Sequence, residues 1–246
     1  MKSSFSPASA LHRQNHLLAA LGIEVQARVF QHLELVQLPL GKVLYESGDV
    51  MPYVYFPTDS IVSLLYVMQD GASAEISVVG NEGVVGIALF MGGESTTSRA
   101  VVQSGGCAFR LQAQLLKDEF GRHGELLVLL LRYTQSLITQ TAQTAACNRH
   151  HSVDQQLCRW LLLSLDRLPG TRLTMTQELI ANMLGVRRVG VTEAAGKLQK
   201  LGAIEYSRGQ ITIKNRPQVE RMCCECYQAV KIESDRLLKN FVYREN

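Results

Sequence analysis

The residues best suited to recognise another molecule gather in one basic segment, residues 172–216. It carries 8 Lys/Arg against 3 Asp/Glu. Arg187 and Arg188 follow a turn at Gly185, and Arg208 lies in a second turn. A guanidinium can donate two parallel hydrogen bonds to a guanine, while hydroxyl groups and backbone amides suit phosphate oxygens. The segment therefore has the chemistry of a nucleic-acid-binding surface.

The elements that must present these residues are two helices and a hairpin. Thr174 with Gln177 three residues later predicts a capping box, and Gly185 ends the helix that follows. A second helix is predicted from Arg187 to Leu201. It is apolar on the face of Val191, Ala194, Ala195, Leu198 and Leu201, and its other face holds Val189, Thr192, Glu193, Gly196 and Lys200. Two short strands, 204–207 and 210–213, then form a hairpin with a basic tip.

A helix, a turn, a second helix and a basic hairpin are typical of a winged DNA-binding module. A single helix fits the major groove of B-DNA, and its first residues meet the base edges. The residues expected to contact DNA are Thr176, Gln177, Arg187, Arg188, Val189, Thr192, Glu193, Lys197, Ser207 and Arg208. Two alternatives remain open, namely plain helix packing and a basic domain that docks a protein partner.

The front of the chain contains short β-type runs separated by Gly, Asp and Pro turns. The runs are 33–40, 43–45, 53–56, 61–68, 74–79, 99–103 and 107–111. Such a pattern predicts an all-β roll, barrel or sandwich and excludes alternating βαβ units. One helix, 9–32, is expected before the strands.

A long helix is predicted between the two halves, from Gly124 to Arg149. One stripe of it recurs at three- and four-residue steps and contains Leu127, Leu130, Thr134, Leu137, Thr141 and Ala145. The stripe is apolar at first and then small and hydroxylic. We expect this stripe to pair with a second copy of the chain, with burial inside one domain as the alternative. A further amphipathic helix is expected over 219–241.

The six cysteines are the residues whose type would suit metal or redox chemistry. Cys107, Cys147 and Cys158 lie in or beside apolar segments, where a free thiol packs as a small hydrophobe. The group at 223–226 is denser, but no Cys/His pair stands at a zinc-like spacing from it, and His151 is far away in sequence. We therefore expect packing, with metal or redox chemistry as the alternative, and assign no metal ligands. No catalytic motif is present, so we expect no enzyme.

Composition and charge are those of a globular protein with two different halves. The 246 residues are 46% hydrophobic and 19% charged. Residues 1–120 carry 7 Lys/Arg against 11 Asp/Glu, and the rest carry 18 against 11. The basic half is the one that suits nucleic acid. No secretory signal and no membrane-spanning run is apparent, so we expect a cytoplasmic protein with no membrane partner.

The order of β-roll, long helix and winged helix-turn-helix resembles the Crp/Fnr family of bacterial transcription regulators (cyclic-AMP receptor protein and fumarate-nitrate regulator). Residues 176–192 carry the most specific part of the resemblance. It implies an α+β fold with a cyclic-nucleotide-binding-like sensor domain (1–123), a dimerisation helix (124–150), and a winged helix-turn-helix domain with an extra C-terminal helix (151–246). It also implies a homodimer with double-stranded DNA and RNA polymerase as partners.

The resemblance also assigns roles to individual residues of the second helix. Arg188 takes the place of the arginine that reads guanine. The glutamate expected next is replaced by Val189, and a further base-reading arginine is replaced by Glu193. The resemblance therefore predicts DNA binding with an altered half-site, in which Val189 could contact a thymine methyl and Glu193 could accept from cytosine.

For the sensor, the resemblance points to the segment from Gly80 to Ala100. In relatives that bind cyclic AMP, a glutamate holds the ribose and an arginine neutralises the phosphate. The matching candidates here are Glu82, Arg99 and Ala100, with Glu94 as an internal partner for Arg99 and Thr141 near the base. Asn81 replaces the expected glycine. Cyclic AMP, another anionic effector and no small ligand all remain open. An iron-sulfur cluster is not expected, because no cysteine precedes Cys107.

Overall fold

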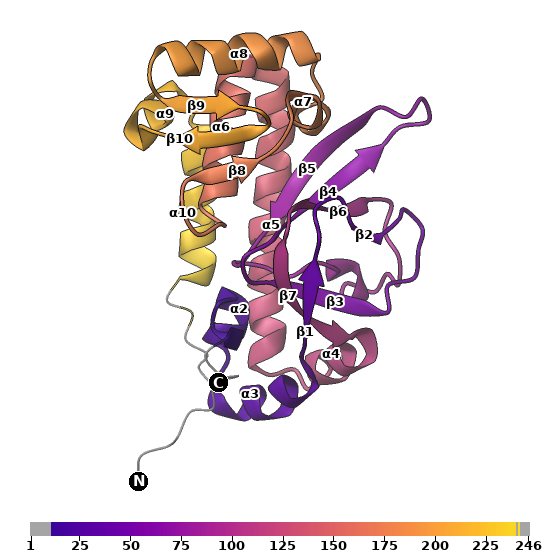
Figure 1. Ribbon diagram of the computed structural model, residues 1–246. Coiled ribbons are helices and arrows are strands. Elements are labelled where there is room, and N and C mark those ends of the chain that lie inside the picture. Colours follow the sequence, from indigo (N-terminus) through magenta and orange to yellow (C-terminus); the bar gives the residue numbers. More distant parts are fainter. Residues whose placement is uncertain (1–10, 240, 242–246) are drawn as a thin grey trace.

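The computed structural model describes residues 11–239 and 241 (Figure 1). Two antiparallel sheets form the β-roll of the first half. One has the order β1-β7-β3 and the other β2-β6-β4-β5. The strands are β1 (Glu34–Leu38), β2 (Val43–Tyr45), β3 (Tyr53–Pro57), β4 (Ile61–Val67), β5 (Ser73–Val79), β6 (Arg99–Ser104) and β7 (Gly106–Gln112). These strands lie where the apolar runs and turns predicted them.

The prediction of one continuous helix over 9–32 is wrong, because this segment forms several short helices. Its first two residues lie outside the described part, and the rest forms α2 (His16–Ala20), α3 (Ile23–Val29) and η1 (Phe30–His32). The Asn15 side chain accepts hydrogen bonds from the backbone of Leu17 and Leu18, so a helix begins there. Another begins after Gly22. The short elements η2 (Ile87–Leu89) and α4 (Ala113–Phe120) complete the β-roll domain.

The long helix α5 (Glu125–His150) has the predicted length, but the middle of the predicted pairing stripe faces inward, while Ala145 at its end is exposed. Leu130, Thr134 and Leu137 are buried against the chain's own β-roll. The helix has apolar residues on two faces. Leu130 and Leu137 of the stripe that was predicted to pair with a second copy pack inside the protomer. The row that remains exposed on α5 contains Leu131, Gln135, Ile138 and Ala142, and it is joined by Ala145, the last residue of the predicted stripe.

The last third of the chain contains the helix-turn-helix and the wing. Its elements are α6 (Val153–Leu165), β8 (Arg172–Thr174), α7 (Gln177–Leu184), α8 (Arg188–Lys200), β9 (Ile204–Ser207) and β10 (Gln210–Ile213). The hairpin has a third strand that we did not expect, because β8 pairs with β10. The fold is thus a β-roll, a long helix and a winged helix-turn-helix.

The prediction of one continuous C-terminal helix over 219–241 is also wrong, because this segment forms two helices. The chain forms α9 (Arg216–Met222), then a break, then α10 (Cys226–Leu238). Cys223 is extended at the break. Figure 1 shows α10 running alongside α5, and the two helices are in contact. Within the described residues, no helix is long and apolar enough to cross a membrane.

A shared core joins the β-roll to the helix-turn-helix. Ile61, Leu65 and Val78 of β4 and β5 belong to the same buried cluster as Leu161 of α6 and Ile180 of α7. The sheet β2-β6-β4-β5 therefore has one face covered by the other half of the chain. This packing sets the position of α7 relative to the β-roll (Figure 1).

Candidate DNA-binding surface and interdomain pocket

The local sequence explains the shape of the helix-turn-helix. Thr176 is the N-cap of α7, and its side chain accepts from Leu179 N at 3.2 Å. The cap thus lies two residues after the predicted Thr174, which belongs to β8. Gly185 ends α7 with φ 65°, a left-handed conformation that glycine adopts without steric cost. Helix α8 begins at Arg188, so the two arginines stand at its N-terminus.

The two faces of α8 are divided as predicted except at Leu201, which was expected on the apolar face but is the C-cap and is 54% exposed. Val191, Ala194 and Leu198 are buried against α6 and α7. On the other face, the side chain of Arg188 and the residue Val189 are each 67% exposed. An exposed valine in the first turn of a helix has no packing role, so it is available to a partner.

A concave notch of about 270 Å³ lies between the start of α7, the start of α8 and the tip of the wing. Its lining residues are Thr176, Gln177, Arg188, Tyr206, Arg208 and Gly209. Four of these six were predicted as DNA contacts, and the fold brings them together from three elements. Tyr206 was missed, because it lies within a strand and gave no signal beyond its β propensity. Its hydroxyl donates to Met175 O at 2.8 Å.

The other predicted DNA contacts differ in their exposure and in whether they already bind another side chain of the protein. Arg187, Glu193 and Ser207 are exposed. The Thr192 hydroxyl donates to Gln177 Oε1 at 2.7 Å, which fixes α8 to α7. Lys197 Nζ lies 2.7 Å from Asp154 Oδ2 on α6, so this cation is already neutralised by the protein. Arg188 Nε lies 3.9 Å from Glu178 Oε2 of α7, in a longer and more exposed pair than that of Lys197. The start of α8 and the wing tip thus carry the positive charge that is most open to a partner.

The candidate effector residues are not gathered in one place. Arg99 lies beside Glu46, with 3.1 Å between Nε and Oε2, and Glu94 pairs with Lys117 instead. The expectation that Glu94 is the partner of Arg99 is therefore wrong, because Glu46 takes that position. Ala100 is buried on β6. Thr141 donates to its own helix at Leu137 O and lies 3.2 Å from Ser77 Oγ.

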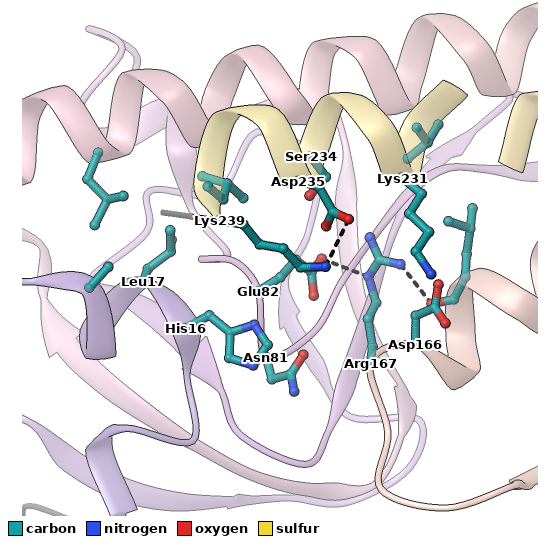
Figure 2. Close-up of a pocket in the computed structure, with 15 residues that line it drawn as sticks. His16, Leu17, Asn81, Glu82, Asp166, Arg167, Lys231, Ser234, Asp235 and Lys239 are labelled. Carbon is teal, nitrogen blue, oxygen red and sulfur yellow. Dashed lines mark hydrogen bonds and ion pairs between the residues drawn. The ribbon is translucent and has the colours of Figure 1, made fainter. Parts of the chain in front are cut away.

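Glu82 lines a pocket of about 470 Å³ between the β-roll, α5, the end of α6 and α10. Figure 2 shows Arg167 reaching toward Glu82, and Arg167 Nε donates to Glu82 Oε1 at 2.7 Å. Both side chains are largely buried, at 9% and 17% exposure. Lys231, Asp235 and other α10 residues close the pocket. The glutamate that the resemblance places on a ribose is here bound to the DNA-binding half.

Two glycines allow this close approach. A Cβ on Gly80 would lie 2.6 Å from the Cβ of Arg167, and a Cβ on Gly83 would overlap the ring of Tyr133 on α5. Real Cβ atoms do not come so close to other carbons. The turn from Gly80 to Gly83 is therefore fitted to both the long helix and the loop after α6.

A buried polar network crosses the same domain junction. Ser63 Oγ lies 2.5 Å from Glu75 Oε2 and 2.8 Å from Gln103 Oε1, and Gln103 Nε2 donates to Ser164 Oγ of α6. A serine has one hydrogen to donate, so both contacts are satisfied when Glu75 is protonated and donates to Ser63. Burial raises the pKa of Glu75 to about 7, against the opposing effects of Ser63 and Arg159.

Comparisons with known proteins agree with this arrangement. Residues 35–123 match the family model of the cyclic nucleotide-binding domain, and residues 155–222 match that of the Crp-like helix-turn-helix domain. The global nitrogen regulator of Synechococcus elongatus is 23% identical over 193 residues, covering 74% of this chain and 86% of that protein.

Solved structures give the same fold at low identity. FixK2 from Bradyrhizobium japonicum has a TM-score of 0.66 at 16% identity, covering 78% of this chain and 98% of that one. The c-di-GMP responsive global regulator CLP of Xanthomonas campestris has a TM-score of 0.61 at 16% identity, covering 78% and 99%. The fold is thus that of a β-roll joined to a winged helix-turn-helix.

The two family models together match more than half of the chain, in the order in which that fold arranges them. The chain belongs to the Crp/Fnr family of transcription regulators.

Proposed function

We propose that this protein is a homodimeric transcription regulator that binds a specific DNA sequence through α8. The observation that carries the proposal is the notch formed by Thr176, Arg188 and Arg208, which opens beside the exposed face of α8. Phosphate oxygens suit the cap hydroxyl and the wing arginine, while Arg188 suits a guanine edge. The alternative in which the basic domain docks a protein makes no use of this division of roles.

Dimerisation is the second part of the proposal. Two recognition helices must lie about 34 Å apart to enter successive major grooves on one side of a palindrome. The exposed row on α5 with Leu131, Ile138, Ala142 and Ala145 is suited to pairing with its own copy, since apolar and small residues let helices approach closely. Parallel pairing of the two α5 helices through this row would place both DNA-binding domains at the same end of the dimer.

The operator sequence is expected to differ from the family's usual half-site. Val189 can contact a thymine methyl where relatives carry a glutamate, and Glu193 accepts hydrogen bonds where they carry an arginine. Selection of bound sequences from a random DNA pool tests this point. Recovery of the family's usual half-site would contradict the proposed roles of Val189 and Glu193.

Control by a small anionic effector is the third part. An anion entering the interdomain pocket would compete with Glu82 for Arg167 and so alter the junction of the two halves. Calorimetric titration with cyclic AMP, cyclic GMP and cyclic di-GMP tests it. Saturable binding that is lost in Arg167→Gln supports this part. Absence of binding by all three nucleotides would leave a regulator without these ligands.

The DNA-binding part is tested by Arg188→Ala. We expect specific binding to weaken by about 1–3 kcal/mol, which is roughly 5- to 150-fold, because a bidentate base contact is lost. The measurement is fluorescence anisotropy with the selected operator at several salt concentrations. Arg236→Ala is the matched control, because Arg236 is similarly exposed (63% against 67%) but lies on α10.

The salt dependence separates the two readings of the basic domain. Phosphate contacts predict a steep loss of affinity as salt rises. A domain that docks a protein predicts no DNA binding at any salt concentration, and this outcome would overturn the proposal. Loss of the dimer in Arg188→Ala would show that α8 has a structural role that we do not assign to it.

A further inference from the structure

Four side chains of the kinds that bind metal ions meet where α5 ends and α10 begins. They are Cys147, His151, Cys224 and Cys226, and their candidate ligand atoms all lie within 4.8 Å of one another. Cys147 Sγ lies 3.6 Å from Cys224 Sγ, and Cys226 Sγ lies 3.5 Å from His151 Nδ1. The sequence concealed this group, because more than seventy residues separate its two parts.

These spacings suit one tetrahedral ion. With Zn–S bonds of about 2.3 Å and a Zn–N bond of about 2.0 Å, tetrahedral geometry places two sulfurs about 3.8 Å apart and a sulfur and a nitrogen about 3.5 Å apart. The two contacts above have nearly these lengths. Three cysteines and one histidine are also a common ligand set of structural zinc sites.

Two neighbouring side chains, Glu225 and Gln143, contact the cluster in the way that outer-shell residues contact the ligands of a bound metal. Glu225 Oε1 lies 3.3 Å from His151 Nε2, so the other ring nitrogen, Nδ1, is left facing the cysteines. A carboxylate on the far nitrogen fixes the ring of a metal-bound histidine. Gln143 Nε2 donates to Cys226 Sγ at 3.1 Å, a contact that favours a thiolate.

The charge of the surroundings also favours a filled site. Three thiolates and a neutral imidazole around a divalent cation carry one net negative charge. Arg159 of α6 is 4% exposed. Its Nη1 donates to Thr144 Oγ1 at 2.9 Å, and within the described part of the chain its Nε has no hydrogen-bond partner. A buried cation of this kind needs a nearby anion.

We propose that Cys147, His151, Cys224 and Cys226 bind one zinc ion that ties the start of α10 to the end of α5. His151 is the C-cap of α5, and Ser152 is the N-cap of α6. The ion therefore sits at the hinge from which the helix-turn-helix domain departs. The extra C-terminal helix is the element that completes the site. This site requires neither DNA binding nor an effector.

The first experiment is a metal titration of the full-length protein, purified under reducing and anaerobic conditions and stripped with a chelator. Cobalt(II) serves as the probe, because it takes the tetrahedral sites of zinc and has visible absorption. We expect one equivalent per chain, with sulfur-to-cobalt charge-transfer bands that disappear when zinc is added. Failure to bind cobalt in this form would overturn the proposal.

The second experiment assigns the ligands. Cys224→Ser and His151→Ala are expected to abolish the tetrahedral cobalt spectrum, and Glu225→Gln to weaken zinc binding about 10- to 100-fold. Cys223→Ser and Cys107→Ser are controls that remove a thiol outside the cluster and should bind normally. Equal loss in a control would overturn the assignment.

A third measurement needs no variant and so does not depend on variant folding. In mild denaturant, where buried thiols react, zinc should slow the alkylation of Cys147, Cys224 and Cys226, as mapped by mass spectrometry, but not that of Cys158, which is equally buried outside the cluster. A disulfide between Cys147 and Cys224 in protein isolated under reducing conditions would contradict the zinc site. Neither result depends on whether the protein binds DNA.

Discussion

At the scale of single residues, Glu75 is a buried carboxyl whose raised pKa makes the stability of the fold depend on pH. It lies in the network with Ser63 and Gln103 at the junction of the β-roll and α6. Its pKa rises from 4.5 to about 7 because the carboxyl is buried. The folded chain therefore holds a proton that the unfolded chain releases between these values, and the resulting stability, complete below pH 4.5, is lost as the pH rises to about 7.

Glu75→Gln is expected to remove this dependence. The pKa difference corresponds to about 3 kcal/mol, so the variant should be more stable than the wild type at pH 8 by up to that amount and similar at pH 5. Urea unfolding at both pH values is the measurement. Ser77→Ala is not expected to alter the pH profile, since Ser77 contacts Thr141 and not Glu75. An unchanged profile in Glu75→Gln would show that another group titrates.

Gly83 makes a steric prediction at the same scale. Gly83→Ala places a methyl group against the buried ring of Tyr133, and overpacking of this kind costs about 1–3 kcal/mol. Gly196→Ala is the matched control, because a Cβ there meets nothing within 4 Å and removing a helical glycine should stabilise by about 0.5–1 kcal/mol. Thermal unfolding of both variants measures the difference. Equal stability of the two would contradict the close fit at Gly83.

At the scale of elements, α5 has two different apolar faces. The inner face, with Leu130 and Leu137, completes the core of the β-roll. The outer face keeps Leu131 and Ile138 in solvent, at 45% and 55% exposure. A solitary exposed leucine is ordinary, but two on one helix face, followed by alanines, form the surface that we propose for pairing.

Ile138→Asp is expected to prevent dimerisation, because two like charges would be buried in the seam. Ile232→Asp is the control, since Ile232 is 64% exposed but lies on α10. Sedimentation analysis gives the oligomeric state of each variant, and operator binding should fall only in the first. A dimer that survives Ile138→Asp would place the seam elsewhere.

Prediction from sequence succeeded where the signal is local. The strands follow alternating apolar residues between glycine turns, and α7 and α8 follow helical spacing and the glycine at 185. It failed where a contact between two segments distant in sequence determines which residues are buried or which side chains meet. Helix α5 has two candidate faces, and only the β-roll shows which one is covered. The cysteine and histidine ligands belong to distant segments, and no spacing rule relates Cys147 to Cys224.

The partners of individual charges were also beyond the sequence. Arg99 was expected to need an internal carboxylate, and it has one, but Glu46 supplies it instead of Glu94. Glu82 was predicted as an effector contact, and in the structure its partner is Arg167 from the other half of the chain. Charge complementarity can be anticipated from residue types, whereas the choice among several carboxylates depends on the register of β2 and β6.

At the scale of the whole molecule, the two halves share one apolar core, in which Ile61 and Val78 of the sensor sheet pack with the helix-turn-helix. A fragment that ends after α5 would expose this apolar sheet face to water. We expect fragment 1–150 to precipitate on expression while the intact chain stays in solution, which sedimentation of a cell extract would reveal. A truncated gene product of this kind would be cleared as an aggregate and would not persist as a free sensor.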